Sequence, residues 1–213
     1  MKLNTITKFL CVASVIASPL SFADNIDGAI SFTTVPDVSI IQLQALAFGG
    51  GMPLTLNDTC VLLVSDTVNP SETDAGISNS GAAEAGTYQT RTGQCDNTIK
   101  GTAGIYSVSG GSGVPIKITL NALTGTKFNF SPTGTVGNYD GANTANGDTF
   151  VALVADTEAT VNLANTNDVT NAVAGGAPQA GKTKVFVGGT MTASSNLVAG
   201  TTYTESFTID ITY

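Results

Sequence analysis

Residues 203–213 read YTESFTIDITY, and this stretch decides the fold. Its apolar residues occupy alternate positions: Tyr203, Phe207, Ile209, Ile211 and Tyr213. Only Glu205 interrupts the row, and the residues between are polar. Because successive side chains of a β-strand point to opposite faces, this period of two predicts a strand with one buried face and one solvent face.

The same pattern recurs along the chain. Further strands are expected at 38–48, 59–65, 103–109, 114–121, 126–130, 149–155, 158–164 and 183–193. Turn sequences such as SGGSG at 109–113 separate them, and no segment shows the 3.6-residue period of an amphipathic helix. Gly188-Gly189 is expected to mark a bulge or a close backbone approach. The chain is therefore predicted to be all-β, an immunoglobulin-like antiparallel β-sandwich.

Residues 35–213 are expected to form a single sandwich domain, since β-sandwiches commonly reach about 200 residues. A polar excursion at 65–101 interrupts the strand pattern. It is expected to hold at most one short strand, near 87–91. A loop of this length without structure is unusual inside a domain, which favours a strand within it.

The first 23 residues predict export. Lys2 and Lys8 precede the apolar stretch FLCVASVIA at 9–17, and small residues stand at Ser21 and Ala23 before Asp24. This is the pattern of a cleaved signal peptide, so we expect passage through the periplasm to the cell surface or extracellular space. Removal of 1–23 leaves six basic and sixteen acidic residues, a net charge of −10. Such a charge disfavours nucleic acid as a partner, and no remaining apolar run is long enough for membrane insertion.

The mature chain holds two cysteines, Cys60 and Cys95. An oxidising compartment favours a disulfide between them; two free thiols are the alternative. The loop of 34 residues would make this bridge worth about 3–4 kcal/mol. A metal site is poorly supported, because the chain has no histidine and no C-x-x-C spacing.

Nothing in the sequence nominates catalysis or a cofactor. The absence of histidine removes Ser-His-Asp and Cys-His arrangements. Distant carboxylates could still converge in the fold, but no local cluster points to them. The oxygen-rich loop at 140–148, which holds Asp140 and Asp148, could offer ligands to calcium, but its spacing differs from the EF-hand loop and a solvated turn is expected. We expect a protein that is not an enzyme.

Residues 176–183, GAPQAGKT, match the nucleotide-binding pattern G-x-x-x-x-G-K-[ST]. A working P-loop follows a buried strand and opens a helix, so that the helix N-terminus faces the phosphates. Here the preceding residues are polar and the following KVFVGG is a poor helix start. The match is therefore interpreted as a loop that enters a strand from Thr183 onward, with Lys182 and Lys184 on the solvent face, where lysine discourages edge pairing.

The segment after the signal peptide, 24–34, also has a strand pattern. Ile26, Gly28, Ile30 and Phe32 alternate with Asp27, Ala29 and Ser31. It could be the first strand of the sandwich. The alternative is a donor strand that pairs with a sheet edge of a neighbouring molecule.

Both ends of the mature chain resemble a known family. LAFGG at 46–50 resembles the L-x-F-G element of bacterial secreted pilin-like domains, of the spore coat protein U and chaperone–usher types. Residues 200–213 resemble their closing strand, with Gly200 fourteenth from the end; Tyr213 is last, whereas the family has its aromatic residue next to last. The resemblance implies a sandwich that lacks one strand, with a groove bordered by the C-terminal strand. It also implies a periplasmic chaperone and an outer-membrane usher as partners.

The predicted function is a non-catalytic structural subunit of an extracellular fibre or biofilm matrix. Copies of itself or related subunits would be its partners, joined by β-strand exchange. The alternative is a self-complete secreted sandwich that acts as an adhesive or ligand-binding module.

Overall fold

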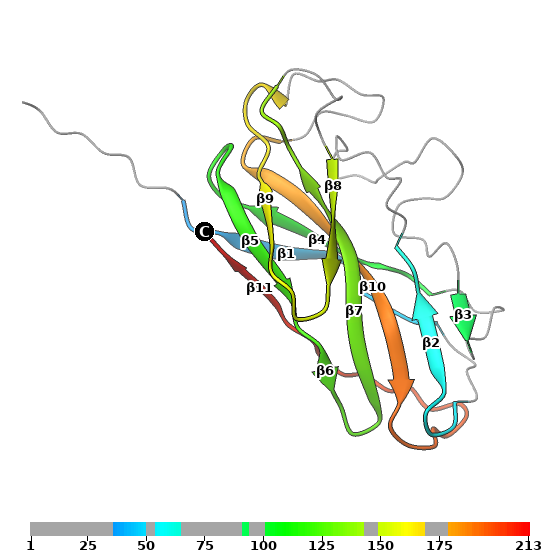
Figure 1. Cartoon of the computed structure of the whole chain (residues 1–213). Coiled ribbons are helices and arrows are strands. Elements are labelled where there is room, and N and C mark those ends of the chain that lie inside the picture. The colour runs from blue at the N-terminus through cyan, green and yellow to red at the C-terminus, as the bar shows by residue number, and fades with distance from the viewer. Residues whose placement is uncertain (1–35, 50–53, 65–90, 94–100, 143–148, 169–178) are drawn as a thin grey trace, which may run out of the picture. The chain divides into compact units, whose positions relative to one another are not determined.

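The computed structural model describes residues 36–49, 54–64, 91–93, 101–142, 149–168 and 179–213. In these residues every ladder is antiparallel except for one isolated bridge, and no α-helix occurs. The strands form two sheets that curl into a half-barrel (Figure 1). The predicted all-β, antiparallel sandwich class is therefore confirmed.

The larger sheet is built on two long central strands, β7 (Phe128–Asn138) and β10 (Lys182–Ala193). The other edge of β10 pairs first with β4 (Gly104–Ser109) and then with β2 (Thr59–Leu62). Beyond these lie β1 (Ser39–Gln44) next to β4 and β3 (Arg91–Gly93) next to β2. The outer edge of β7 carries β6 (Leu123–Thr124) and β8 (Thr149–Val154).

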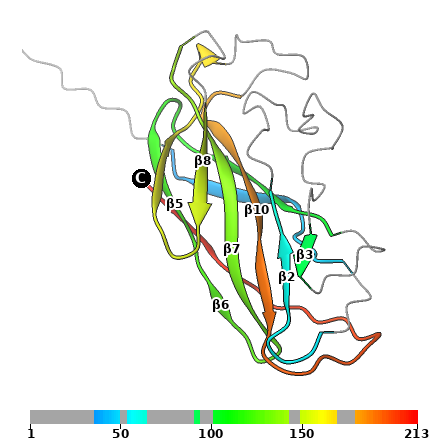
Figure 2. The same cartoon turned by 45° about the vertical axis from the view of Figure 1, so that its right-hand side comes forward.

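The smaller sheet has three strands. β5 (Pro115–Leu120) lies in the middle, between β9 (Ala159–Asn162) and β11 (Ile209–Thr212). Figures 1 and 2 show this sheet stacked over the β4, β7 and β10 strands of the larger one.

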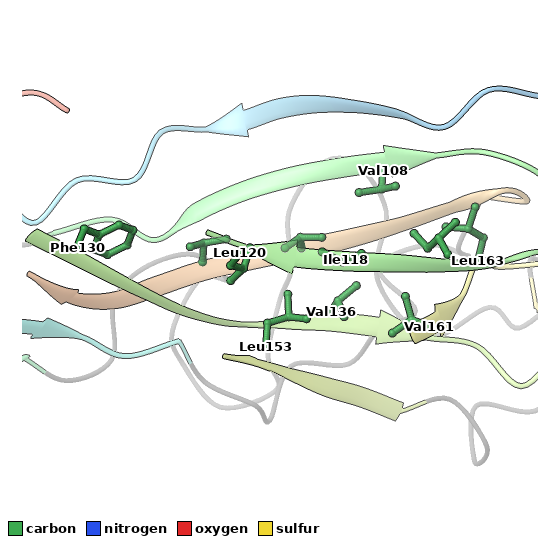
Figure 3. Close-up of a cluster of buried hydrophobic side chains, with 11 residues drawn as sticks. Val108, Ile118, Leu120, Phe130, Val136, Leu153, Val161 and Leu163 are labelled. Carbon is green, nitrogen blue, oxygen red and sulfur yellow. The ribbon is translucent and has the colours of Figure 1, made fainter. Parts of the chain in front are cut away.

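The hydrophobic core fills the space between the two sheets. Its side chains come from alternate positions of facing strands, as the period of two predicts. Figure 3 shows them meeting from both sides: Val108, Ile118, Leu120, Phe130, Val136, Leu153, Val161 and Leu163. A smaller cluster at one end contains Leu54, Cys60, Met191 and Ala193.

Gly188 and Gly189 lie where β10 changes partner from β4 to β2. A Cβ on Gly188 would lie 2.2 Å from the Leu62 carbonyl oxygen, and Gly189 has a φ of 140°. The predicted close backbone approach is confirmed, because a side chain at Gly188 would overlap the neighbouring strand.

Several predicted boundaries were wrong. The strand expected at 126–130 continues to Asn138, and the two-residue strand β6, before it, lies between the expected strands. The C-terminal strand forms a ladder only over Ile209–Thr212, not from 203. Within the polar excursion, β3 lies at Arg91–Gly93, just beyond the short strand expected near 87–91; the rest of 65–101, apart from Gly101, lies outside the described residues.

The signal peptide at 1–23 and the candidate donor strand at 24–34, with Ile26, Gly28, Ile30 and Phe32, also lie outside the described residues. Both therefore stay predictions. In the part of the chain that the structure describes, no helix is long and apolar enough to cross a membrane.

Candidate functional site: the open side between β1 and β11

One side of the half-barrel is closed by hydrogen bonds between the sheets. The Asp156 amide donates to the Leu120 carbonyl at 2.8 Å, and Leu120 also forms an isolated bridge with Ala155. Near the other end of this side, the Asn162 amide donates to Asn138 Oδ1 at 2.8 Å. These bonds tie β5 and β9 to the ends of β7 and β8, so the two sheets are joined on this side, although in the described part of the chain β8 forms a ladder only with β7 and β9 only with β5.

The opposite side has no such closure. β1 is the last strand of the larger sheet beside β4, and β11 is the last strand of the smaller sheet beside β5. No ladder joins β1 to β11 among the described residues. Both strands lie near the C terminus at one end and diverge from there (Figures 1 and 2). We call the region between them the open side. Its two banks are β1 with the adjoining part of the larger sheet, and β11 with the segment that precedes it.

The open side exposes side chains that belong to the core. Ile40 of β1 pairs with the buried Val108 of β4 and so faces the interior, yet it is 39% exposed. On the other bank, Ile209 and Ile211 pack against the main core but remain half-buried. In the neighbouring strands Val108 of β4 and the core residues of β5 are fully buried, whereas Tyr106 of β4 is half-buried.

Aromatic rings cross the open side away from the C terminus. Phe207 lies edge-on to Tyr106 of β4, with ring centroids 6.3 Å apart, and to Phe130 at 5.3 Å. Phe48 continues the row at 5.7 Å from Phe130. Edge-to-face pairs of this kind stabilise by about 0.5–1.5 kcal/mol each. They attach the segment before β11 to the larger sheet without any backbone ladder.

Tyr106 is half-buried in this row, and burial raises the pKa of its phenol above the ordinary value of 10.0. The cause is desolvation, which penalises the phenolate. Tyr106 therefore stays neutral well into the alkaline range and acts as an apolar ring in the lining of the open side.

Tyr213 connects the two banks at the C-terminal end. Its hydroxyl donates to the Pro36 carbonyl, just before β1, and accepts the Gly111 amide at 3.0 Å. Pro36 leads into one sheet and Gly111 lies in the turn between β4 and β5. We call this group of three residues the latch.

The predicted C-terminal residues fall into two groups. Ile209 and Ile211 lie in β11 and Phe207 lies just before it; all three are half-buried and pack against the main core. Half-buried and exposed positions alternate from Ser206 to Thr212, and Glu205 interrupts the pattern as the sequence suggests. That these residues border a groove for an added strand stays a prediction. Gly200 instead occupies a turn, with a φ of 77° that favours glycine. The Tyr203 hydroxyl accepts the Val198 amide at 2.9 Å, which fastens this turn.

Sequence reasoning missed the opposite bank. Val38, Ile40, Leu46 and Tyr106 were placed in strands, but nothing in their pattern showed that β1 would be the last strand of its sheet or that Tyr106 would contact Phe207. The LAFGG element supplies part of this bank, because Leu46 and Phe48 pack against the main core. The latch was also missed, since its partners are far apart in sequence.

Cys60 is fully buried in β2, opposite Gly93 of β3. Cys95 follows Gly93 by two residues and lies outside the described part of the chain. Two residues span at most about 7 Å, so the register keeps the predicted disulfide within reach, and it stays a prediction.

The GKT end of the nucleotide-binding match enters a strand. The Gly181 amide donates to the Ala164 carbonyl at 2.6 Å and the Lys182 amide to the Gln179 carbonyl at 3.0 Å, so both amides are bound to protein. Residue 182 then begins β10, which confirms the expected strand. The expectation that lysine protects an edge here was wrong, because β10 has neighbours on both sides, and Lys182 and Lys184 are half-buried.

The loop at 140–148, which is expected to be a solvated turn and could offer oxygen ligands to calcium, is only partly described. Asp140 Oδ1 accepts the Ala142 amide at 2.8 Å, a local turn bond, and 143–148 lie outside the described residues. Among the residues that are described, no three acidic or cysteine side chains are grouped as a metal site.

The fold and the open side define the chain as an all-β protein with an incompletely closed antiparallel half-barrel. Comparison with models of known families, with curated proteins and with solved structures found no match. The pilin-like resemblance therefore stays a prediction.

Proposed function

We propose that this chain is a non-catalytic structural subunit of an extracellular fibre or matrix, which polymerises when residues 24–34 of one copy fill the open side of another. The observation that carries the proposal is the unequal closure of the half-barrel. Isolated hydrogen bonds tie the two sheets together on the β8–β9 side, whereas among the described residues no ladder joins β1 to β11 and Ile40 of β1 is exposed. Unpaired edges next to apolar side chains are the surfaces to which an added strand binds.

Residues 24–34 are proposed to fill the open side because of their side-chain pattern. Residues 24–34 carry four uncharged residues in a period of two, Ile26, Gly28, Ile30 and Phe32. An inserted strand would direct this row at Ile40, Tyr106 and Ile209 and would give both edges main-chain partners. Burial of each large aliphatic or aromatic side chain contributes about 1.5–3 kcal/mol, so three such residues would make a very stable contact.

One observation favours the alternative, a self-complete adhesive or ligand-binding sandwich. The latch already joins the start of β1 to the end of β11, and the aromatic row joins the two sheets farther along. If these contacts suffice, the domain is stable alone. Export and the Cys60–Cys95 disulfide belong to both proposals, whereas a periplasmic chaperone and an outer-membrane usher belong only to the first.

Truncation separates the two functions. We would compare the mature chain, residues 24–213, with a chain that lacks 24–34, by gel electrophoresis in SDS without heating and by thermal unfolding. A fibre subunit is expected to form SDS-resistant multimers only when 24–34 are present. Monomers of equal stability from both chains would rule out strand exchange and support the self-complete module.

A matched pair of substitutions tests the facing row. Ile30→Asp places a charge on the row that is proposed to enter the open side, whereas Ser31→Asp places it on the alternate row. Multimers are expected to be lost with Ile30→Asp and kept with Ser31→Asp. Equal behaviour of the two variants would show that a period-two contact is not involved.

A further inference from the structure

The end of the domain remote from the latch exposes two large aliphatic side chains on joined loops. Leu56 is 54% exposed and Val198 is 67% exposed. The Leu56 amide donates to Asn196 Oδ1 at 2.9 Å, and the Leu197 amide donates to the Leu54 carbonyl at 3.0 Å. We call residues 54–58 and 194–203 the distal end. An exposed apolar pair on a fixed surface of this kind suits a protein contact.

The chain that precedes β1 leaves from the opposite end, where the latch holds Pro36. The twelve residues of β10 connect the two ends: Gly181, just before β10, accepts the Gly110 amide near the latch, and Ala193 pairs with Asp58 at the distal end. At about 3.3 Å per residue, the ends lie on the order of 40 Å apart.

The next step rests on the proposed function. When residues 24–34 fill a neighbouring open side, only Val35 separates the inserted strand from Pro36. We call the copy that supplies the strand the donor and the copy that receives it the acceptor. One or two residues span at most about 7 Å, so the latch of the donor must lie next to the acceptor, at the end of the open side where the inserted strand ends.

The direction of insertion decides which end this is. β1 runs away from the latch and β11 runs towards it, so an inserted strand is antiparallel to one of them and parallel to the other. An inserted strand antiparallel to β1 would end beside the latch of the acceptor and would place the exposed Asp37 residues of the two copies close together. A strand antiparallel to β11 would leave at the distal end, beside Leu56 and Val198.

We propose that the distal end of each copy binds the latch of the copy whose strand it has received. Leu56 and Val198 would pack against Pro36 and the ring of Tyr213 of that second copy. Tyr213 is 46% exposed in the single chain, so it offers apolar surface to such a contact. The contact joins two different surfaces and repeats without closing, which produces an open filament with a fixed angle between subunits.

Cysteine cross-linking tests the contact in the full mature chain. Chains with Val198→Cys and chains with Ser112→Cys, an exposed residue beside the latch, would be mixed before assembly and treated with a short bismaleimide. The control replaces Val198→Cys with Val154→Cys, which is 56% exposed on β8. Cross-linked dimers are expected from the Val198 pair at several times the yield of the Val154 pair.

The outcomes distinguish the two proposals. SDS-resistant multimers with equal cross-linking from both pairs would overturn the end-to-end contact and leave strand exchange standing. A failure to form multimers would overturn both. As a second test, Leu56→Asp with Val198→Asp is expected to leave multimers intact but make filaments visibly more curved in electron micrographs, whereas Val154→Asp is expected to leave their straightness unchanged. Straight filaments from the double variant would also overturn the contact.

Discussion

Tyr213→Phe is the sharpest test of how the banks of the open side are held together. The change removes one hydroxyl, which donates to the Pro36 carbonyl and accepts the Gly111 amide. Gly111 is buried, so its amide would lose its partner without gaining water, at a cost of about 1–3 kcal/mol. Pro36 is exposed and its carbonyl can bind water instead. We therefore expect the free energy of unfolding to fall by about 1–3 kcal/mol.

Urea and thermal unfolding of a chain that lacks residues 24–34 would measure this loss without interference from assembly. For a domain of this size, the melting temperature is expected to drop by roughly 2–12 °C. Tyr203→Phe is the matched control, because its hydroxyl accepts only the Val198 amide in an exposed turn, and it is expected to cost less than about 1 kcal/mol. Equal losses from both variants would refute the structural role assigned to the latch.

Three further predictions concern other parts of the domain. Gly188→Ala is expected to destabilise by about 3 kcal/mol or more in urea unfolding, because its Cβ would lie 2.2 Å from the Leu62 carbonyl oxygen. The phenol of Tyr106 has a higher pKa in the folded chain than in the unfolded chain, so the unfolded chain loses the phenol proton at a lower pH. The free energy of unfolding should therefore fall as the pH rises from about 10 through the pKa of the folded state. Tyr106→Phe should lose this contribution, so the free energy of unfolding of the variant, measured as a function of pH, should fall less above a pH of about 10 than that of the wild type. Cys60 and Cys95 should take up an alkylating label only after reduction, as seen by intact mass, and labelling without reduction would contradict the disulfide.

The C-terminal stretch shows what a period of two can and cannot predict. The alternation of half-buried and exposed side chains holds from Ser206 to Thr212, yet the ladder covers only Ile209–Thr212. Its partner β5 ends at Leu120, and beyond that residue one backbone bond, from the Asn121 amide to the Thr208 carbonyl, continues the contact together with the Asn121 side chain, which donates to Thr208 Oγ1 and Asp210 Oδ2. Hydrophobic alternation reports which face is covered, whereas the length of a ladder depends on the neighbouring strand.

Local propensity failed in β7. Its residues from 132 onward include Pro132, Gly134 and Gly137, which usually indicate a turn. The structure keeps them in a central strand because β10 approaches very closely: a Cβ on Gly134 would lie 2.1 Å from the Phe186 carbonyl oxygen. Glycine is required there by a contact with a residue 52 positions later, which no local pattern could reveal.

The open side follows from topology and not from any one segment. The sequence shows that 26–32 and 203–213 have the same alternating pattern, but it does not show that β1 and β11 end up as facing edges. Within the compact unit Val35–Tyr213, no ladder joins β1 to β11 among the described residues, and the sequence carries one further strand-like segment before this unit. If that segment folded back on its own domain, the turn would fall at Val35–Asp37 and the strand would run antiparallel to β1. Insertion that joins the latch of one copy to the distal end of the next requires a strand antiparallel to β11. The direction of the added strand therefore distinguishes self-closure from this mode of polymerisation. The truncation experiment tests whether residues 24–34 are needed for assembly, and the cross-linking experiment tests the strand direction through the contact between the distal end and the latch.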